Sequence, residues 1–203
     1  MAGSGLPGGA RGLVASAPLC LLAAVLLCGP AALAQTLQDK IAACAACHGE
    51  NGQSLDPNIP HIGGQPKLAV MYQLFFYREG RRKNPEMNTV AKDMSDAELD
   101  AIAEWVSKLP PPPPAGGPSE PARLLQGEAI ANGRQCGTCH NPDYSGREQM
   151  PRIAGQREGY LLKSFKDYQA GARVGTQAAM AEAVRGLNDA ELADLAYYLA
   201  RFR

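Results

Sequence analysis

The strongest constraint on this 203-residue chain is a five-residue pattern that occurs twice. Residues 44–48 and residues 136–140 both read Cys-x-x-Cys-His, and the two copies lie 92 residues apart. A pattern that recurs at such a spacing indicates that the chain holds two copies of one structural unit. The sequence therefore predicts two similar domains rather than one large one.

Other segments match between the copies at nearly the same spacing. Residues 60–65 read Pro-His-Ile-Gly-Gly-Gln, and residues 151–156 answer with Pro-Arg-Ile-Ala-Gly-Gln, 91 residues later. The segment Asp-Ala-Glu-Leu at residues 96–99 recurs 93 residues later at 189–192. The spacing changes by one or two residues because the loops of the copies differ slightly in length.

A proline-rich segment separates the two copies. Residues 110–121 contain five consecutive prolines followed by two glycines and two further prolines. Such a composition favours an extended, stiff polyproline II linker. We therefore expect one domain at residues 35–109, a linker at 110–121 and a second domain at 122–203.

The first 34 residues look like a secretory signal peptide. Their only charge is Arg11, residues 13–27 are strongly apolar, and Ala-Leu-Ala at residues 32–34 precedes Gln35. These are the basic region, apolar region and small-residue cleavage site of a signal. We expect cleavage after Ala34 and export to the periplasm, and retention of the segment as an N-terminal anchor stays open. The net charge of −1 that remains does not favour a nucleic-acid partner.

The mature chain is predicted to be all-α. Apolar residues follow helical spacing in several segments, and two of these helices begin with an N-terminal cap, Ser95-x-x-Glu98 in the first copy and Asn188-x-x-Glu191 in the second. No convincing run of alternating polar and apolar residues predicts a strand. The expected helices cover residues 37–46, 67–79, 95–109, 127–136, 159–170 and 188–202.

The Cys-x-x-Cys-His pattern predicts covalent attachment of haem. Two thiols three residues apart can form thioethers with the two vinyl groups of one haem, and the adjacent histidine then binds the iron. A zinc site would need cysteine and histidine pairs that converge on one metal, and a thioredoxin-like motif would need a βαβ context. We therefore expect two covalently bound haem c groups, attached through Cys44, Cys47, His48 and through Cys136, Cys139, His140.

The sixth iron ligands are predicted to be methionines. His61 is the only histidine outside the two motifs, so two irons cannot both have two histidine ligands. Met87 and Met180 are the only methionines at equivalent positions, and each is expected in a loop before the last helix of its domain. Met94 is the rival in the first copy, but its counterpart is Leu187. We interpret His61 as a surface or haem-edge residue.

These motifs resemble those of a known family. Each half is similar to a class I cytochrome c, and residues 35–203 together resemble the diheme cytochrome c4 family. The resemblance implies two tandem cytochrome c domains in which the carbonyls of Pro60 and Pro151 accept the free ring N–H of His48 and His140. The long proline linker departs from the compact connection expected in that family.

The resemblance implies an electron carrier rather than an enzyme. A haem with both axial positions filled by protein is suited to one-electron iron chemistry. The expected donor is a quinol-oxidising complex or a dehydrogenase, and the expected acceptor is a haem-copper oxidase, with loose association with the membrane as an option. We expect a monomer with internal pseudo-twofold symmetry and haems that face across the domain interface. An electron-accepting subunit of a dehydrogenase and a diheme peroxidase remain as alternatives.

Overall fold

The computed structural model describes residues 1–5, 8, 29–173 and 178–203, and only the backbone of residues 29–36. It divides into two units, residues 1–36 and 37–203. Most of the predicted signal peptide falls outside the described residues. Within the described part of the chain, no helix is both long enough and apolar enough to cross a membrane.

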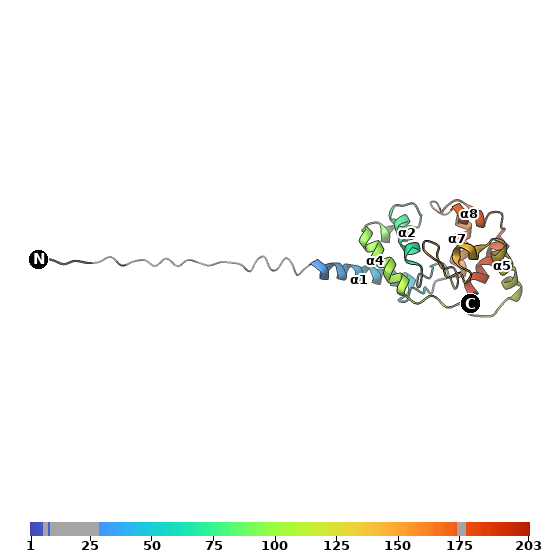
Figure 1. Cartoon of the computed structure of the whole chain (residues 1–203), viewed down its shortest axis with the longest axis horizontal. Coiled ribbons are helices and arrows are strands. Elements are labelled where there is room, and N and C mark those ends of the chain that lie inside the picture. The colour runs from blue at the N-terminus through green and yellow to red at the C-terminus, as the bar shows by residue number, and fades with distance from the viewer. Residues whose placement is uncertain (6–7, 9–28, 174–177) are drawn as a thin grey trace. The chain divides into compact units, whose positions relative to one another are not determined.

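The described residues form helices and no sheet, as the sequence predicts (Figure 1). Two isolated bridges, Arg82 with Arg173 and Arg147 with Met150, are the β-type pairings seen there. The helices are α1 (Gly29–His48), α2 (Lys67–Arg78), α3 (Pro85–Ala91), α4 (Asp96–Lys108), α5 (Pro121–Gly133), α6 (Cys136–His140), α7 (Glu158–Gln169), α8 (Ala178–Ala183) and α9 (Asp189–Arg201).

Both predicted capping boxes are present. The Ser95 side chain accepts a hydrogen bond from the backbone N–H of Glu98, whose carboxylate in turn accepts from the N–H of Ser95. Asn188 and Glu191 make the same reciprocal pair at the start of α9. Each cap satisfies N–H groups that have no partner within the helix, which fixes the start of both terminal helices.

Three local expectations were wrong. The first helix begins at Gly29, before the predicted cleavage site, and runs through the whole first motif to His48. The helix expected to lead into the second motif stops at Gly133, because Gln135 adopts a left-handed conformation with φ of 54° and α6 starts afresh at Cys136. The two candidate methionines lie in the short helices α3 and α8 rather than in loops.

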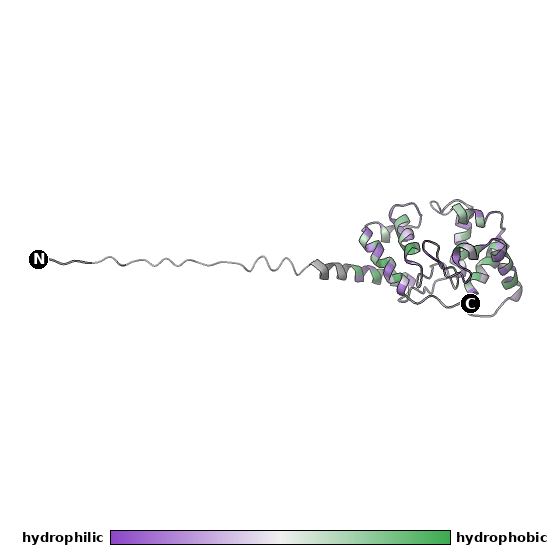
Figure 2. Cartoon of the chain, viewed as in Figure 1, coloured by the Kyte–Doolittle hydropathy of each residue, from purple (hydrophilic) through white to green (hydrophobic). Residues whose placement is uncertain are grey.

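Each half of the chain has its own apolar core. The first core is built on α2 and α4, and the second on α5, α7 and α9. These helices show apolar and polar stripes, as helices with one buried face do (Figure 2). The buried members of the first core are Leu74, Tyr77, Ala91, Met94, Leu99, Ile102 and Val106.

The two halves contact one another through pairs of equivalent residues. The N–H of Ala69 donates to the carbonyl of Glu148 over 3.0 Å, and the N–H of Tyr160 donates to the carbonyl of Pro57 over 3.1 Å. The donors are 91 residues apart, and so are the acceptors. The bridge between Arg82 and Arg173 also joins residues 91 apart. Contacts that recur in this way have the twofold relation predicted from the duplication.

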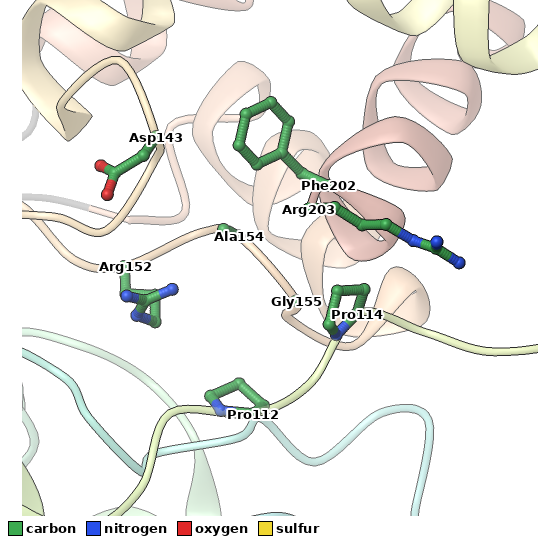
Figure 3. Close-up of a pocket in the computed structure, with 8 residues that line it drawn as sticks. All are labelled: Pro112, Pro114, Asp143, Arg152, Ala154, Gly155, Phe202 and Arg203. Carbon is green, nitrogen blue, oxygen red and sulfur yellow. The ribbon is translucent and has the colours of Figure 1, made fainter.

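The linker is packed against both domains rather than standing free as a rod. A β-carbon at Gly63 would lie 2.5 Å from the Pro110 carbonyl oxygen, and one at Gly155 would lie 2.9 Å from that of Pro112. Pro112 and Pro114 line a pocket of about 220 Å³ beside Gly155, and Figure 3 shows these residues together. Glycine is therefore required where the linker crosses each loop, because a side chain would push the linker away.

Candidate functional site

The first attachment motif occupies the end of α1. The Cys44 thiol is half-buried and burial raises its pKa, whereas Cys47 is exposed. His48 is buried, and its Nδ1 lies 2.9 Å from the carbonyl oxygen of Pro60. A carbonyl can only accept a hydrogen bond, so the ring proton is on Nδ1 and the lone pair of Nε2 is free to bind a metal.

The second motif repeats this geometry in α6. Cys136 is half-buried, Cys139 is exposed and His140 is buried. Nδ1 of His140 lies 2.7 Å from the carbonyl oxygen of Pro151. Burial lowers the pKa of both His48 and His140, although the carbonyl contact opposes it. Each imidazole is therefore held neutral, which is the form that binds iron.

The candidate methionines differ in their position relative to the apolar cores. Met87 and Met180 are partly buried and pack against the first and second core. Asn84 caps the short helix of Met87 by accepting from its backbone N–H over 2.8 Å. Met94 is itself a core residue with 4% of its surface exposed. This burial agrees with the interpretation of Met94 as a core residue at the entry of α4.

The donor set fits a c-type haem. Each motif presents two thiols and a neutral imidazole from one turn of helix, and a thioether from a later helix of the same half is available as a second axial ligand. Five buried side-chain nitrogens have no hydrogen-bond partner among the described residues, and three of them, His61 Nδ1, Arg152 Nε and Arg157 Nε, lie within six residues of Pro60 or Pro151 in the sequence. Buried donors of this kind suit the carboxylates that a haem carries.

His61 is not a surface residue, so that part of its interpretation was wrong. Only 9% of its surface is exposed. Burial, together with the nearby positive charge of Arg157 and the ring of His48, lowers the pKa of His61 to about 4. The residue therefore remains neutral at ordinary pH, inside the contact between the two halves.

Two glutamines join the motif loops of the two halves, which are residues 60–65 and 151–156. The N–H of His61 donates to Oε1 of Gln156 over 2.7 Å, and Nε2 of Gln156 donates to the His61 carbonyl over 2.8 Å. Gln65 makes the same pair of bonds with the backbone of Arg152, both at 2.9 Å. Sequence reasoning missed this role, although the signal was present as a Gly-Gln pair repeated at a spacing of 91.

A cluster of arginine and tyrosine side chains also joins the two halves. Arg82 Nη2 is 3.0 Å from the hydroxyl of Tyr160, and Arg173 Nη2 is 3.3 Å from Oε1 of Gln73. Burial raises the pKa of Tyr160, but Arg82 and Arg173 lower it by more. The two arginines therefore polarise the phenol of Tyr160 at this part of the interface.

Family models match both halves of the chain. The model described as "Cytochrome C oxidase, cbb3-type, subunit III" matches residues 31–106, and the model described as "Cytochrome c" matches residues 124–202. Two matched cytochrome c domains imply two covalently bound haem c groups.

Curated relatives and a solved structure match the chain over most of its length. A cytochrome c4 of Stutzerimonas stutzeri is 31% identical over 158 residues, which are 69% of this chain and 74% of the relative. A thiosulfate dehydrogenase electron acceptor of Thiomonas intermedia is 31% identical over 175 residues, or 78% of each chain. The crystal structure of reduced cytochrome c4 from Pseudomonas stutzeri superimposes with a TM-score of 0.74 at 29% identity, covering 84% of this chain and 98% of that one.

The agreement covers the tandem motifs, the all-helical fold of both halves and nearly the whole length of a solved relative. Members of the matched family are electron-transfer proteins rather than catalysts, which sets aside the peroxidase alternative. The chain belongs to the diheme cytochrome c4 family, whose members carry electrons on two covalently bound haems.

Proposed function

We propose that His48 with Met87, and His140 with Met180, are the axial ligands of the two haem irons. Thioethers from Cys44 and Cys47, and from Cys136 and Cys139, would attach the haems. Bound haem supplies one-electron iron chemistry, and the protein holds the imidazoles neutral and oriented through Pro60 and Pro151. Met87 and Met180 are the methionines that equivalent short helices of both domains present beside a core.

The ligand assignment is tested with two methionine variants. Met87→Ala should abolish the weak far-red sulfur-to-iron charge-transfer band of one haem and lower its reduction potential, because a methionine ligand favours ferrous iron. Met94→Leu should keep both bands, since Met94 fills the core. Loss of a band in Met94→Leu, with both bands kept in Met87→Ala, would show that the ligand in the first domain is Met94.

We infer further that the protein works in the periplasm as a carrier between respiratory complexes. A quinol-oxidising complex or a dehydrogenase would reduce it, and a haem-copper oxidase would oxidise it. The observation that supports an internal relay is the direct contact between the two motif loops through Gln65 and Gln156. An electron that enters one domain can then leave from the other without a second encounter in solution.

Two measurements test this assignment. The mass of the protein isolated from the periplasm should equal that of residues 35–203 plus two haems; free thiols at Cys136 and Cys139 would contradict it. Membranes that oxidise quinol should reduce the purified protein, and a haem-copper oxidase should reoxidise it. Failure of both reactions would reject the role as a respiratory carrier.

A second candidate follows from the relatives. Proteins named thiosulfate dehydrogenase electron acceptor are 31% and 32% identical to this chain, each over 78% of their own length. A dedicated acceptor would co-purify with its dehydrogenase in a fixed ratio and would be reduced rapidly when thiosulfate is added. A free carrier would purify alone and would show no such reduction.

A further inference from the structure

Two chains of hydrogen bonds cross the contact between the domains. In the first, Oε1 of Gln156 accepts from the N–H of His61, and the carbonyl of the same peptide group belongs to Pro60, which accepts from Nδ1 of His48. The first domain therefore supplies the histidine and the peptide, and the second domain supplies the glutamine. The distances along this chain are 2.7 Å and 2.9 Å.

The second chain runs in the opposite direction. Oε1 of Gln65 accepts from the N–H of Arg152 over 2.9 Å. The carbonyl of that peptide group belongs to Pro151, which accepts from Nδ1 of His140 over 2.7 Å. Each domain therefore ends the chain that begins at the histidine of the other.

A single peptide group joins the two hydrogen bonds in each chain. When its N–H donates, electron density shifts toward its carbonyl oxygen, which becomes a stronger acceptor. Hydrogen bonds in such a series strengthen one another by roughly 10–30% per bond. A stronger acceptor on Nδ1–H makes the imidazole a more basic ligand.

The glutamines are held firmly enough for this effect to be reproducible. Each carboxamide makes two bonds to one backbone residue of the other domain, so it cannot rotate without losing both. Gln156 is 4% exposed and Gln65 is 8% exposed, so water does not compete readily for these bonds. The Oε1 atom of Gln156 also accepts from the N–H of Arg157 over 2.9 Å, which ties it to its own loop.

We propose that Gln156 is a positioning residue for His48 and that Gln65 is a positioning residue for His140. Each domain thereby sets the donor strength of the proximal imidazole in the other domain. The inference rests on the haem ligation proposed above. A more basic imidazole stabilises ferric iron, so removing a glutamine should raise the reduction potential of the haem in the opposite domain.

The test uses Gln156→Leu and Gln65→Leu in the intact diheme protein. Leucine keeps most of the side-chain volume and removes both hydrogen bonds to the other domain, and in Gln156→Leu also the bond from the N–H of Arg157. Gln156→Leu should shift the ferric–ferrous equilibrium at His48 toward ferrous iron about threefold, which corresponds to about 28 mV at 59 mV per tenfold for one electron. The equilibrium at His140 should change much less. Gln65→Leu should give the reverse pattern.

The two midpoint potentials are assigned with Met87→His and Met180→His, since each lowers the potential of its own haem. Gln73→Leu serves as the matched control, because Gln73 contacts Arg82 and Arg173 at the interface but takes part in neither series of hydrogen bonds. Gln73→Leu should not shift the reduction potential of one haem relative to that of the other. If all three leucine variants shifted both haems equally, the glutamines would act only through general loosening of the interface, and the proposal would be wrong.

A second measurement covers the case in which a leucine variant folds poorly. Gln156→Asn keeps a carboxamide that is one methylene too short to reach His61. In ferrous protein, the proton resonance of the His48 ring N–H should then move upfield while that of His140 stays in place. A shift at His140 instead would overturn the crosswise assignment. Absence of the far-red bands from the unmodified protein would contradict the methionine ligation proposed above, whereas an unchanged His48 ring N–H resonance in Gln156→Asn would overturn the glutamine proposal.

Discussion

The two domains share their motifs but close the region around their first helix differently. In the second domain, α5 crosses α9 at Gly127, where a β-carbon would collide with the carbonyl of Asp194 and the side chain of Tyr198. The residue nine positions before the first cysteine is glycine in this copy and Gln35 in the first copy. An ion pair joins the corresponding helices in both domains, Lys40 with Glu98 at 2.6 Å between α1 and α4, and Arg123 with Asp194 at 2.8 Å between α5 and α9.

The space beside this crossing is also filled differently. Tyr144, Tyr198 and Phe202 meet edge to face in the second domain, with ring centroids 4.7–6.1 Å apart. Gly52 takes the place of Tyr144 in the first domain, since both carbonyls accept from the equivalent isoleucine. A groove of about 550 Å³ lies beside Trp105 there. The second domain thus adds close aromatic packing beside this crossing, where the first domain leaves a groove.

The largest effect should come from making the second domain resemble the first. Tyr144→Gly removes a buried aromatic ring and should destabilise the second domain by about 3 kcal/mol, after the relief of a strained positive φ at that residue. Denaturant unfolding followed through the absorption of each haem would measure this. Tyr72→Ala, at a half-exposed position of α2, should cost only about 0.5 kcal/mol. Equal losses of unfolding free energy in these two variants would contradict the difference in packing between the domains.

A smaller effect is expected at the helix crossing itself. Gly127→Ala places a methyl group against Asp194 and Tyr198, so α5 and α9 must separate, at a cost of about 1–3 kcal/mol. Gly133→Ala is the matched control in the same helix, because nothing lies within 4 Å of a β-carbon there. That control should stabilise α5 by about 0.5–1 kcal/mol. Thermal unfolding measures the stability of both variants. An unchanged stability in Gly127→Ala would mean that α5 and α9 can accommodate a methyl group where they cross.

The smallest effect concerns the ion pair of the first domain. Glu98→Ala should cost about 1 kcal/mol, because it removes half of the capping box together with the contact to Lys40. Glu191→Ala, which removes only the cap of α9, should cost less. Unfolding in urea compares the two, and a larger loss of stability in Glu191→Ala would contradict a contribution of the Lys40–Glu98 ion pair to the first domain.

The same carboxylate makes the first domain sensitive to acid. Hydrogen bonds from Lys40 and from Ser95 lower the pKa of Glu98 from 4.5 to about 2. A depressed carboxyl pKa contributes stability that is complete above the ordinary pKa and is lost as the pH falls toward the depressed value. The protein should therefore lose stability between pH 4.5 and pH 2, and Glu98→Ala should lose less over that range.

Local chemistry was the part of the structure that the sequence revealed best. The attachment motifs, the caps at Ser95 and Asn188 and the second-helix stops near Gly80 and Gly171 depend on residues a few positions apart, so a pattern can identify them. The contacts of His48 with Pro60 and of His140 with Pro151 followed from the family resemblance.

Features that join distant segments were not visible in the sequence. The course of the linker over Gly63 and Gly155 depends on how the domains pack, and a five-proline run alone predicts only its stiffness. The burial of His61 likewise depends on Gln156, which is 95 residues away. The break at Gln135 has no local signal, because a left-handed conformation is unusual for glutamine.

The constant spacing of 91 residues between paired contacts also indicates how such a molecule can arise from two copies of one domain. Two identical copies of a single-domain protein that meet about a twofold axis make every contact twice, which is an isologous interface. In a homodimer, one mutation changes both members of each pair. Once the copies are joined in one chain, each member of a pair can change alone. Tyr160, which contacts Arg82, is an example, because the equivalent residue of the first domain is Ala69. Gene fusion thus turns a symmetric contact into one whose two ends can be selected for different tasks.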